Sequence, residues 1–197
     1  MDTQHHPLFD DYTYVVLSAP AFAPLFQRYR PVVFGQTFGY QPEDTYNVQE
    51  ARAARRLQQQ MSGRYRLRIG IYYQETVFAG WTVGWQRDSD VYYMANTGIL
   101  PQHQNRGIYT HLLPTLLSII GKEGFQVVES RHTASNNRVI IPKLKAGFVI
   151  SGLEVSDQFG TLVWLRYFFN ETRRRMMDVR TGEHIPDDEL RQLLHLP

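Results

Sequence analysis

A polar loop between an expected strand and an expected helix has the residue types that bind an anion. The strand is expected to end at Leu100, and the loop residues 104–107 (QNRG) lead directly into an apolar helix. A helix start presents unpaired N–H groups and a partial positive charge, which together can hold a phosphate. Gly107 lets a ligand approach the backbone closely, and Arg106 can add a positive charge. Many strand–loop–helix turns bind nothing, so this arrangement alone leaves the function open.

Hydrophobic periodicity predicts the elements that must position this loop. Strands are expected at residues 12–18, 65–73, 77–87, 90–100, 125–131, 149–155 and 161–169. Helices are expected at residues 20–29, from a cap at Asp44 or Thr45 to about Met61, at 107–120 and at 137–145. Pro31 is expected to end the first helix, and Pro114 to kink or end the third. The alternation predicts an α/β domain with a mixed sheet of about seven strands and helices on both faces.

The two ends of the chain differ from this central part. Residues 1–170 are expected to form the domain, and residues 171–197 a basic tail with a short helix at 186–194. We expect the tail to pack on the domain or on a second subunit, which would make the protein a homodimer. His5 and His6 are expected to belong to a disordered terminal arm rather than to a metal site.

Composition excludes several classes of protein. The 197 residues include no cysteine, which rules out disulfides, thiolate zinc sites, iron–sulfur clusters and a cysteine nucleophile. No apolar stretch reaches the length of a membrane span, and the N-terminus lacks the features of a signal peptide. We therefore expect a cytoplasmic protein with no metal and no membrane partner. The net charge of +2 is too small to require a nucleic-acid partner.

The loop and a second block further along the chain resemble one known family. Residues 104–109 (QNRGIY) are similar to the Q/R-x-x-G-x-G/A signature of the GNAT-type N-acetyltransferases. A second block is similar to the family's N-x-x-A/V-I…K-x-G-F pattern through Asn136, Val139, Ile140, Lys145, Gly147 and Phe148. The resemblance extends over about residues 65–169 and agrees with the expected order of elements. It implies the GNAT fold and transfer of an acetyl group from acetyl-CoA to an amine.

The resemblance also assigns residues to the binding of acetyl-CoA. The Thr110 hydroxyl and the backbone N–H groups of six loop residues would hold the pyrophosphate: Gln104, Asn105, Arg106, Gly107, Ile108 and Tyr109. The main chain of Ile99 and Leu100 and the side chain of Asn136 would bind the pantetheine arm. An N–H group between two parting parallel strands would stabilise the oxyanion of the reaction.

Several positions depart from the family pattern. Tyr109 stands where the signature has Gly or Ala. Pro142 and Lys143 replace an apolar-Tyr pair, so a lysine stands where many members carry the tyrosine that reprotonates the departing thiolate. Tyr93 stands where members with a glutamate base on the fourth strand carry that base. The catalytic residues therefore cannot be transferred directly from the family.

The residues themselves offer five candidate proton carriers: Tyr93, Tyr109, His111, Glu129 and His132. Histidine titrates nearest neutrality, so His132 or a water chain is expected to take the proton of the attacking ammonium. Tyr109 is the candidate acid, and Tyr93 completes the expected catalytic set. The structural alternatives are a surface imidazole for His132 and a hydrogen-bonded strand residue for Glu129. Either Tyr92 or Tyr93 must lie in the core, and the sequence leaves open which of them faces the cleft.

The acceptor is expected to be a small-molecule or peptide amine. Aromatic residues before position 65 would line its site and favour an aromatic or aliphatic amine over a polycationic sugar: Phe22, Phe26, Tyr29, Phe34, Phe38 and Tyr40. Because no cysteine can form an acyl-enzyme, attack would be direct, in a ternary complex. Two other functions stay open. One is a GNAT-fold module that binds acyl-CoA without turnover, and the other is a nucleic-acid protein that acts through its arginine-rich tail.

Overall fold

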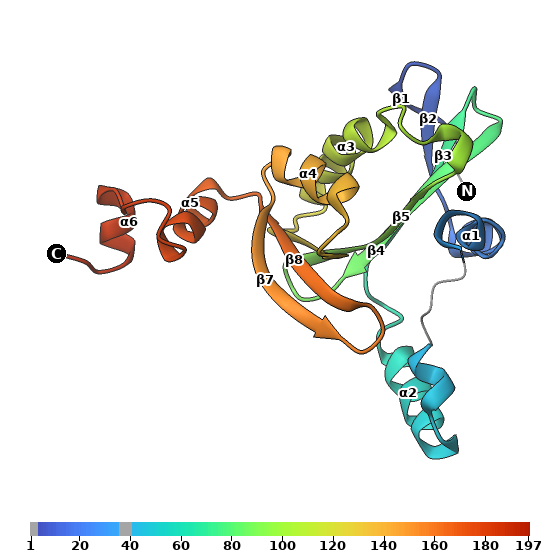
Figure 1. Cartoon of the computed structure of the whole chain (residues 1–197), viewed down its shortest axis with the longest axis horizontal. Coiled ribbons are helices and arrows are strands. Elements are labelled where there is room, and N and C mark those ends of the chain that lie inside the picture. Colours follow the sequence, from blue (N-terminus) through green and yellow to red (C-terminus); the bar gives the residue numbers. More distant parts are fainter. Residues whose placement is uncertain (1–3, 36–40) are drawn as a thin grey trace.

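The computed structural model describes residues 4–35 and 41–197, and its centre is one mixed sheet with helices on both faces (Figure 1). The strands lie in the order β1-β2-β3-β4-β5-β6-β8-β7. Their bounds are β1 (His6–Phe9), β2 (Tyr12–Val16), β3 (Arg66–Tyr73), β4 (Val77–Gln86), β5 (Val91–Ile99), β6 (Val127–Thr133), β7 (Val149–Ser156) and β8 (Gly160–Phe168). The expected α/β class and mixed sheet are confirmed, although the sheet has eight strands rather than about seven.

The four helices expected before residue 170 occur in the expected order, and a helix at residues 171–180 in the basic tail was not expected. Their bounds are α1 (Ala19–Phe34), α2 (Val48–Gln60), α3 (Ile108–Lys122), α4 (Asn137–Lys145), α5 (Glu171–Arg180) and α6 (Asp188–Leu193), with 3₁₀ turns at η1 (Pro42–Thr45) and η2 (Pro101–His103). On α3 an apolar stripe at helical spacing is buried, through Ile108, Leu112, Leu113, Leu116, Leu117 and Ile120. This stripe packs with α4 residue Ile140 against one face of the sheet. Helix α1 packs on the other face, where Phe22 contacts a separate cluster around Trp81.

Strands β5 and β6 are joined over only a short length. They pair in parallel at three positions, from Val91↔Val127 to Tyr93↔Glu129. Beyond Tyr93, β5 stays beside β4 as far as Ile99, while β6 stays beside β8 as far as Thr133. The two halves of the sheet therefore diverge, and we call the opening beyond Tyr93 and Glu129 the fork (Figure 1).

Beside the fork, β5 contains a bulge. Met94 pairs with Gly84 and Asn96 pairs with Val83, so Ala95 is an extra residue between these two pairs. A bulge bends and twists its strand, which turns β5 away from β6 at the point where their pairing ends. The bulge thus accounts for the opening of the fork on the β5 side.

The structure corrects several expectations about the first third of the chain. His6 lies in β1 and stacks on Tyr14 (ring centroids 5.1 Å apart), so the arm expected to be disordered is a strand. Helix α1 continues through Pro31 to Phe34, because packing on the sheet outweighs the hydrogen bond that a proline removes. Asn47, not Asp44 or Thr45, caps α2, and its side chain accepts the N–H groups of the first turn.

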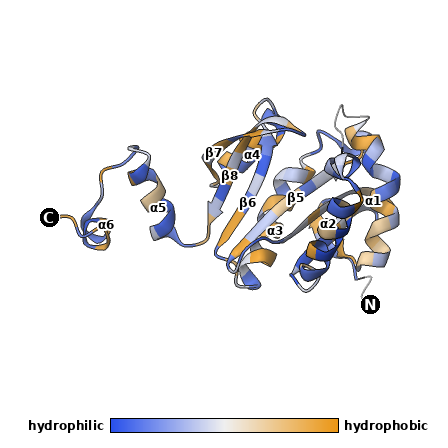
Figure 2. Cartoon of the chain, turned by 90° about the horizontal axis from the view of Figure 1, so that it is seen from below, coloured by the Kyte–Doolittle hydropathy of each residue, from blue (hydrophilic) through white to orange (hydrophobic). Residues whose placement is uncertain are grey.

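The helices after residue 100 have bounds close to those expected from the sequence. Helix α3 runs without interruption through Pro114, so the expectation that this proline ends the helix is wrong. The expected short helix near the C-terminus is present as α6. Residues of the tail form α5 and α6, which extend beyond the end of β8 (Figures 1 and 2), and Arg173 of α5 pairs with Asp90 at 3.3 Å. The packing of this tail on a second subunit stays a prediction.

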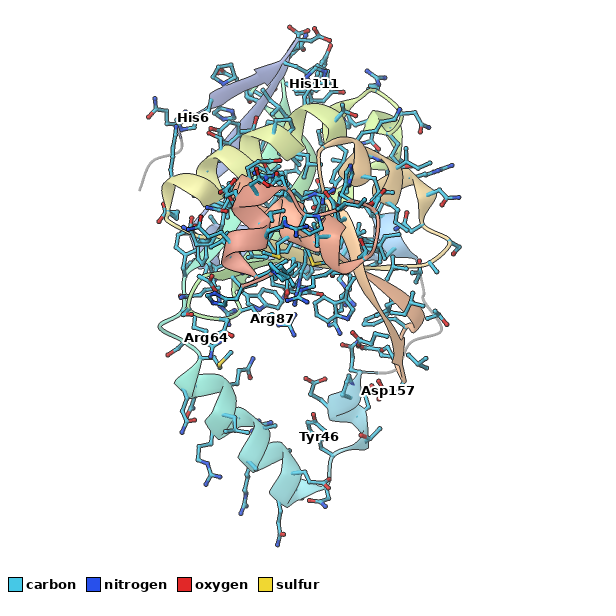
Figure 3. The ribbon with its side chains drawn as sticks, turned by 90° about the vertical axis from the view of Figure 1, so that its left-hand side faces the viewer. His6, Tyr46, Arg64, Arg87, His111 and Asp157 are labelled. Carbon is cyan, nitrogen blue, oxygen red and sulfur yellow. The ribbon has the colours of Figure 1, made fainter. Side chains whose placement is uncertain are left out.

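Helix α2 also lies away from the sheet, and none of its residues is buried (Figure 1). In Figure 3 an open space separates α2 from the sheet, with Arg64 and Arg87 on its sheet side and Tyr46 and Asp157 on its other borders. None of the helices in the described ranges combines the length and the hydropathy that crossing a membrane requires.

Gly98 on β5 has a packing role that can be tested. A Cβ at this position would lie 2.4 Å from the indole of Trp81, which is 0% exposed. We expect Gly98→Ala to lower the free energy of unfolding by about 1–3 kcal/mol, because the overpacked ring must shift. In the control Gly152→Ala, the nearest atom lies 3.9 Å away, and we expect a change below about 0.5 kcal/mol. Urea unfolding measures both, and equal losses would contradict this explanation.

Candidate active site

The loop before α3, residues 104–107, presents free backbone N–H groups at the start of a helix, and we call it the anion loop. Gly107 is the N-cap of α3, with φ 79°, and no side chain caps the helix there. The first helical N–H to find a backbone acceptor is that of His111, which donates to the Gly107 carbonyl at 3.2 Å. Within the described ranges, no acceptor takes the backbone N–H groups of residues 105–110. These N–H groups and the positive end of α3 suit a diphosphate.

Two residues of the signature shape this loop rather than face a ligand. Gln104 donates from its side chain to the Ile99 carbonyl (2.9 Å) and from its backbone to the Pro101 carbonyl (3.2 Å). Its own N–H is therefore engaged, and the free N–H groups begin at Asn105. A Cβ on Gly107 would meet only His111 Cδ2, at 3.8 Å, so glycine is required there by the positive φ and not by crowding.

The hairpin of β1 and β2 contacts residues on both sides of the loop, a role that the sequence did not indicate. The Tyr12 hydroxyl and His103 Nδ1 lie 2.9 Å apart, and both residues are buried. Phe9 stacks on His111 of α3, with ring centroids 4.2 Å apart. Burial and then the nearby Arg106 charge lower the pKa of His103, which disfavours a charged ring beside Tyr12. The unexpected β1 thus fixes both sides of the anion loop.

On the helix face of the fork lies a buried lysine. Lys143 of α4 is 1% exposed, and its Nζ lies 2.6 Å from Ser130 Oγ and 3.7 Å from Met94 Sδ. Ser130 and Met94 directly follow the last paired residues of β6 and β5. Burial lowers the pKa of Lys143 to about 7. The amine is therefore near the midpoint of its titration at neutral pH.

His132 lies on the same face of β6, two residues beyond Ser130. Its Nε2 lies 3.2 Å from Ser130 Oγ. Burial and then the Lys143 charge lower the pKa of His132 to about 3. An imidazole with this pKa binds a proton weakly near neutrality, so the environment does not favour the expected role of His132 as the base of the reaction. A neutral His132 ring can instead accept a hydrogen bond from the Ser130 hydroxyl.

The opposite face of the fork carries aromatic and charged groups. Tyr92 is 3% exposed in the main core, so Tyr93 is the one of the pair that faces away from α3 and α4. Arg131 Nε donates to the Tyr93 hydroxyl at 3.1 Å, and its NH1 donates to Glu154 at 2.7 Å. The Arg131 guanidinium also lies 5.2 Å from the Trp164 ring centroid. Tyr93 is thus a positioned phenol beside a cation.

Glu129 is unsuited to act as a free base. It is 2% exposed and pairs with Arg87 and with Arg166, the latter at 2.7 Å. Glu129 is therefore a hydrogen-bonded strand residue, which is the alternative to a catalytic role that the sequence left open. Within the described residues no group of three or more acidic or histidine side chains is placed to hold a metal ion.

The other sequence-predicted residues have mixed environments. Tyr109 packs against the main core, and burial raises the pKa of its phenol, which weakens it as an acid. Asn136 is the N-cap of α4, and its side chain makes no capping hydrogen bond. Thr110 is exposed in the first turn of α3 and Leu100 is buried at the end of β5. Asn136 and Thr110 can therefore offer side-chain atoms to a ligand.

Most of the aromatic residues proposed to line the acceptor site pack α1 onto the sheet instead. Phe22 stacks on Phe26 (ring centroids 5.5 Å apart), which in turn meets the Trp81 ring edge-on at 5.7 Å. Tyr29 stacks on Phe78 at 4.9 Å. These contacts make them part of the α1 core. Phe38 and Tyr40 lie outside the described residues.

The sequence marks Lys143 as a departure from the family pattern, but the family comparison gave no sign that this lysine is buried. A usable signal was present, because Lys143 follows the buried Ile140 by three residues on α4. Residues three apart share a helix face, so a lysine on the apolar face of a short helix indicates a buried amine.

The lowered pKa of Lys143 predicts a pH-dependent stability. Between pH 7 and its usual pKa of 10.5, the unfolded chain binds a proton that the folded chain does not. The free energy of unfolding should therefore rise with pH over this range, by about 2–3 kcal/mol between pH 7 and 9. Lys143→Met should remove this rise and should be more stable than wild type below pH 7. Urea unfolding measures both proteins at each pH, and parallel curves would contradict the assignment.

Comparison with known proteins agrees with this geometry. A sequence model of the acetyltransferase (GNAT) family matches residues 34–148. No curated protein matches the sequence. Among solved structures, yncA from Salmonella typhimurium, described with its cofactor acetyl-CoA, is 15% identical with a TM-score of 0.59, over 82% of this chain and 96% of that one.

Two further structures show the same fold. The ribosomal-protein-S18-alanine N-acetyltransferase from Escherichia coli is 15% identical with a TM-score of 0.59, over 81% of this chain and 94% of that one. A mutant of the spermidine N-acetyltransferase SpeG from Vibrio cholerae is 10% identical with a TM-score of 0.59, over 80% and 94%. At these identities the likeness shows the fold alone. Because the family match spans more than half of the sequence, the chain belongs to the GNAT acetyltransferase family, and it is an acyltransferase.

Proposed function

We propose that this protein transfers an acetyl group from acetyl-CoA to an amine by direct attack in a ternary complex. The observation that carries the proposal is the combination of the anion loop and the fork. The unpaired N–H groups of residues 105–110 lie just beyond one end of β5, and the fork opens along the same strand. A ligand with an anionic end and a long narrow arm fits this arrangement.

The residues of the chain fit acetyl-CoA in this orientation. The diphosphate would lie on the anion loop, with Thr110 as a further donor. The arm would follow the end of β5 past Ile99 and Leu100, with the Asn136 side chain opposite. Ile99 and Tyr93 are six residue steps apart on β5, about 20 Å at roughly 3.3 Å per step, which is similar to the reach of an extended pantetheine arm.

The thioester would then lie in the fork. There the amine nitrogen attacks the thioester carbonyl, the carbon–sulfur bond breaks, and the electron pair leaves with the sulfur. Main-chain N–H groups of β5 beyond Tyr93, next to the bulge at Ala95, are the candidates to stabilise the oxyanion. With no cysteine in the sequence, an acyl-cysteine intermediate is excluded.

The acceptor would enter from the face that carries Tyr93. The Tyr93 hydroxyl, held by Arg131, is the group on this face that we assign to relay the amine proton to water, because its oxygen can take that proton as it passes its own proton on. The aromatic rings of Trp85 and Trp164 lie beside it, with centroids 5.4 Å and 6.4 Å from the Tyr93 ring. These rings suit an amine with an aromatic or apolar body.

The charges on this face disfavour a polycationic acceptor. Arg131 contacts both Tyr93 and Trp164, and the Arg87 guanidinium lies 4.4 Å from the Trp164 ring centroid. Arg166 joins Arg87 in pairing with Glu129, and Arg131 pairs with Glu154. A hollow between α2 and β3 is also basic. It is lined by Arg55, Gln58, Gln59, Ser62, Arg66 and Arg68. A substrate with several positive charges would be repelled from these arginines.

The cofactor assignment predicts a ligand-dependent stability. Saturating CoA should raise the melting temperature of the wild type, and acetyl-CoA should compete with it. Gly107→Val should abolish this rise, because valine strains the positive φ that presents the N–H groups. Thermal melts with and without CoA measure the effect.

Gly124→Val is the matched control for Gly107→Val. Gly124 also has a positive φ (93°), but it lies at the other end of α3. Both variants should lose intrinsic stability, and only Gly107→Val should lose the response to CoA. Calorimetry that detects no binding of CoA to folded wild type would refute the cofactor assignment.

The acceptor face predicts a substrate preference and a role for Tyr93. In a panel of amines, aromatic or aliphatic monoamines should be acetylated faster than spermidine or aminoglycosides. Tyr93→Phe should lower kcat by about 10²–10⁴-fold, with KM for acetyl-CoA unchanged. Steady-state kinetics with the best amine of the panel tests both, and a preference for polycations would show that this face is not the acceptor site.

A further inference from the structure

The amine of Lys143 lies at the apex of the fork without an acidic partner. Its Nζ contacts one residue from each parting strand, Ser130 Oγ at 2.6 Å and Met94 Sδ at 3.7 Å. It also lies 4.8 Å from the ring centroid of Phe148, at the end of α4. No ion pair within the described residues involves this lysine. The titratable side chain that shares its serine is His132.

Such an environment is costly for a lysine. A buried ammonium loses its hydration, and neither a serine hydroxyl nor a thioether replaces a carboxylate. A methionine of similar length would fill the same space without this cost. A titratable group that burial perturbs strongly, beside a candidate site, is a candidate for chemistry.

The hydrogen bonds at the apex form a directed chain. Lys143 Nζ donates to Ser130 Oγ, so the hydroxyl proton of Ser130 is free to be donated to His132 Nε2, 3.2 Å away. The neutral ring of His132 accepts this hydrogen bond, in agreement with its lowered pKa of about 3. His132 is partly exposed, whereas Ser130 is fully buried. The chain therefore connects the buried amine to the surface.

We propose that Lys143 is a catalytic acid, which gives a proton to the departing CoA thiolate, while Ser130 and His132 position it through their hydrogen bonds. This inference rests on the proposed acetyl transfer. As the carbon–sulfur bond breaks, the sulfur keeps the electron pair and takes a proton from the ammonium, which becomes a neutral amine. The acceptor amine gives its proton to water, directly or by relay through the Tyr93 hydroxyl, and Lys143 regains a proton from water between turnovers, so the protons balance.

The energetics of this transfer are favourable. The pKa of Lys143, about 7, lies within about two units of that of an ordinary thiol, about 8.5, so little free energy separates the ammonium–thiolate pair from the amine–thiol pair. An acid whose pKa is near the working pH is also efficiently recharged between turnovers. Tyr109, by contrast, has a raised pKa and packs against the core.

The test follows the ionisation of the thiol of bound CoA, with desulfo-CoA as the matched ligand that lacks the sulfur. Ammonium and thiolate stabilise each other at contact, so the ultraviolet thiolate absorbance of CoA should titrate about 1–3 pH units lower when bound to wild type than when free. On Lys143→Met the lowering should be lost, while desulfo-CoA should bind both proteins with equal affinity. Ser130→Ala should give an intermediate titration. Lys143→Gln serves the same purpose if the methionine variant does not fold.

The outcomes separate this inference from the proposal on which it rests. An unshifted thiol on wild type, or the same shift on wild type and on the Lys143 variants, overturns the role of Lys143 and leaves CoA binding intact. Failure of both CoA and desulfo-CoA to bind folded wild type overturns the acetyl-transfer proposal, and the role of Lys143 with it.

Discussion

The limited pairing of β5 with β6 is the constraint on which the rest of the site depends. Two parallel strands that paired along their full length would close the sheet, and there would be no fork between the faces that carry Lys143 and Tyr93. Pairing stops after Tyr93↔Glu129, the bulge at Ala95 turns β5 aside, and β6 stays bound to β8. Because the anion loop follows directly after β5, the same strand sets both the opening and the position of the loop.

The fork separates two chemical environments. On the helix face, an isolated amine is buried among Ser130, Met94 and Phe148, and its pKa is lowered because burial disfavours its charge. On the other face, arginines and aromatic rings surround Tyr93 in a partly exposed setting. In acyl transfer from a thioester to an amine, one proton must leave the nucleophile and one must reach the leaving group. Under the proposed mechanism, the two faces would supply a separate group for each transfer.

The sequence predicted what depends on local pattern and missed what depends on tertiary contact. Alternating apolar residues located the central strands, and the residues QNRG located the anion loop. Strand β1 was missed because its four residues, which include Pro7, carry no clear alternation and are fixed by β2. The burial of Lys143 and the outward direction of Tyr93 arise from how α4 and β6 meet β5. A single residue's type does not encode that arrangement.

A structure of the protein with CoA bound is the most direct test of this account. We predict that the diphosphate oxygens accept hydrogen bonds from the N–H groups of residues 105–110. We also predict that the sulfur lies in the fork within contact distance of Lys143 Nζ, with Tyr93 on its far side. CoA bound elsewhere, or with its sulfur outside the fork, would contradict the account.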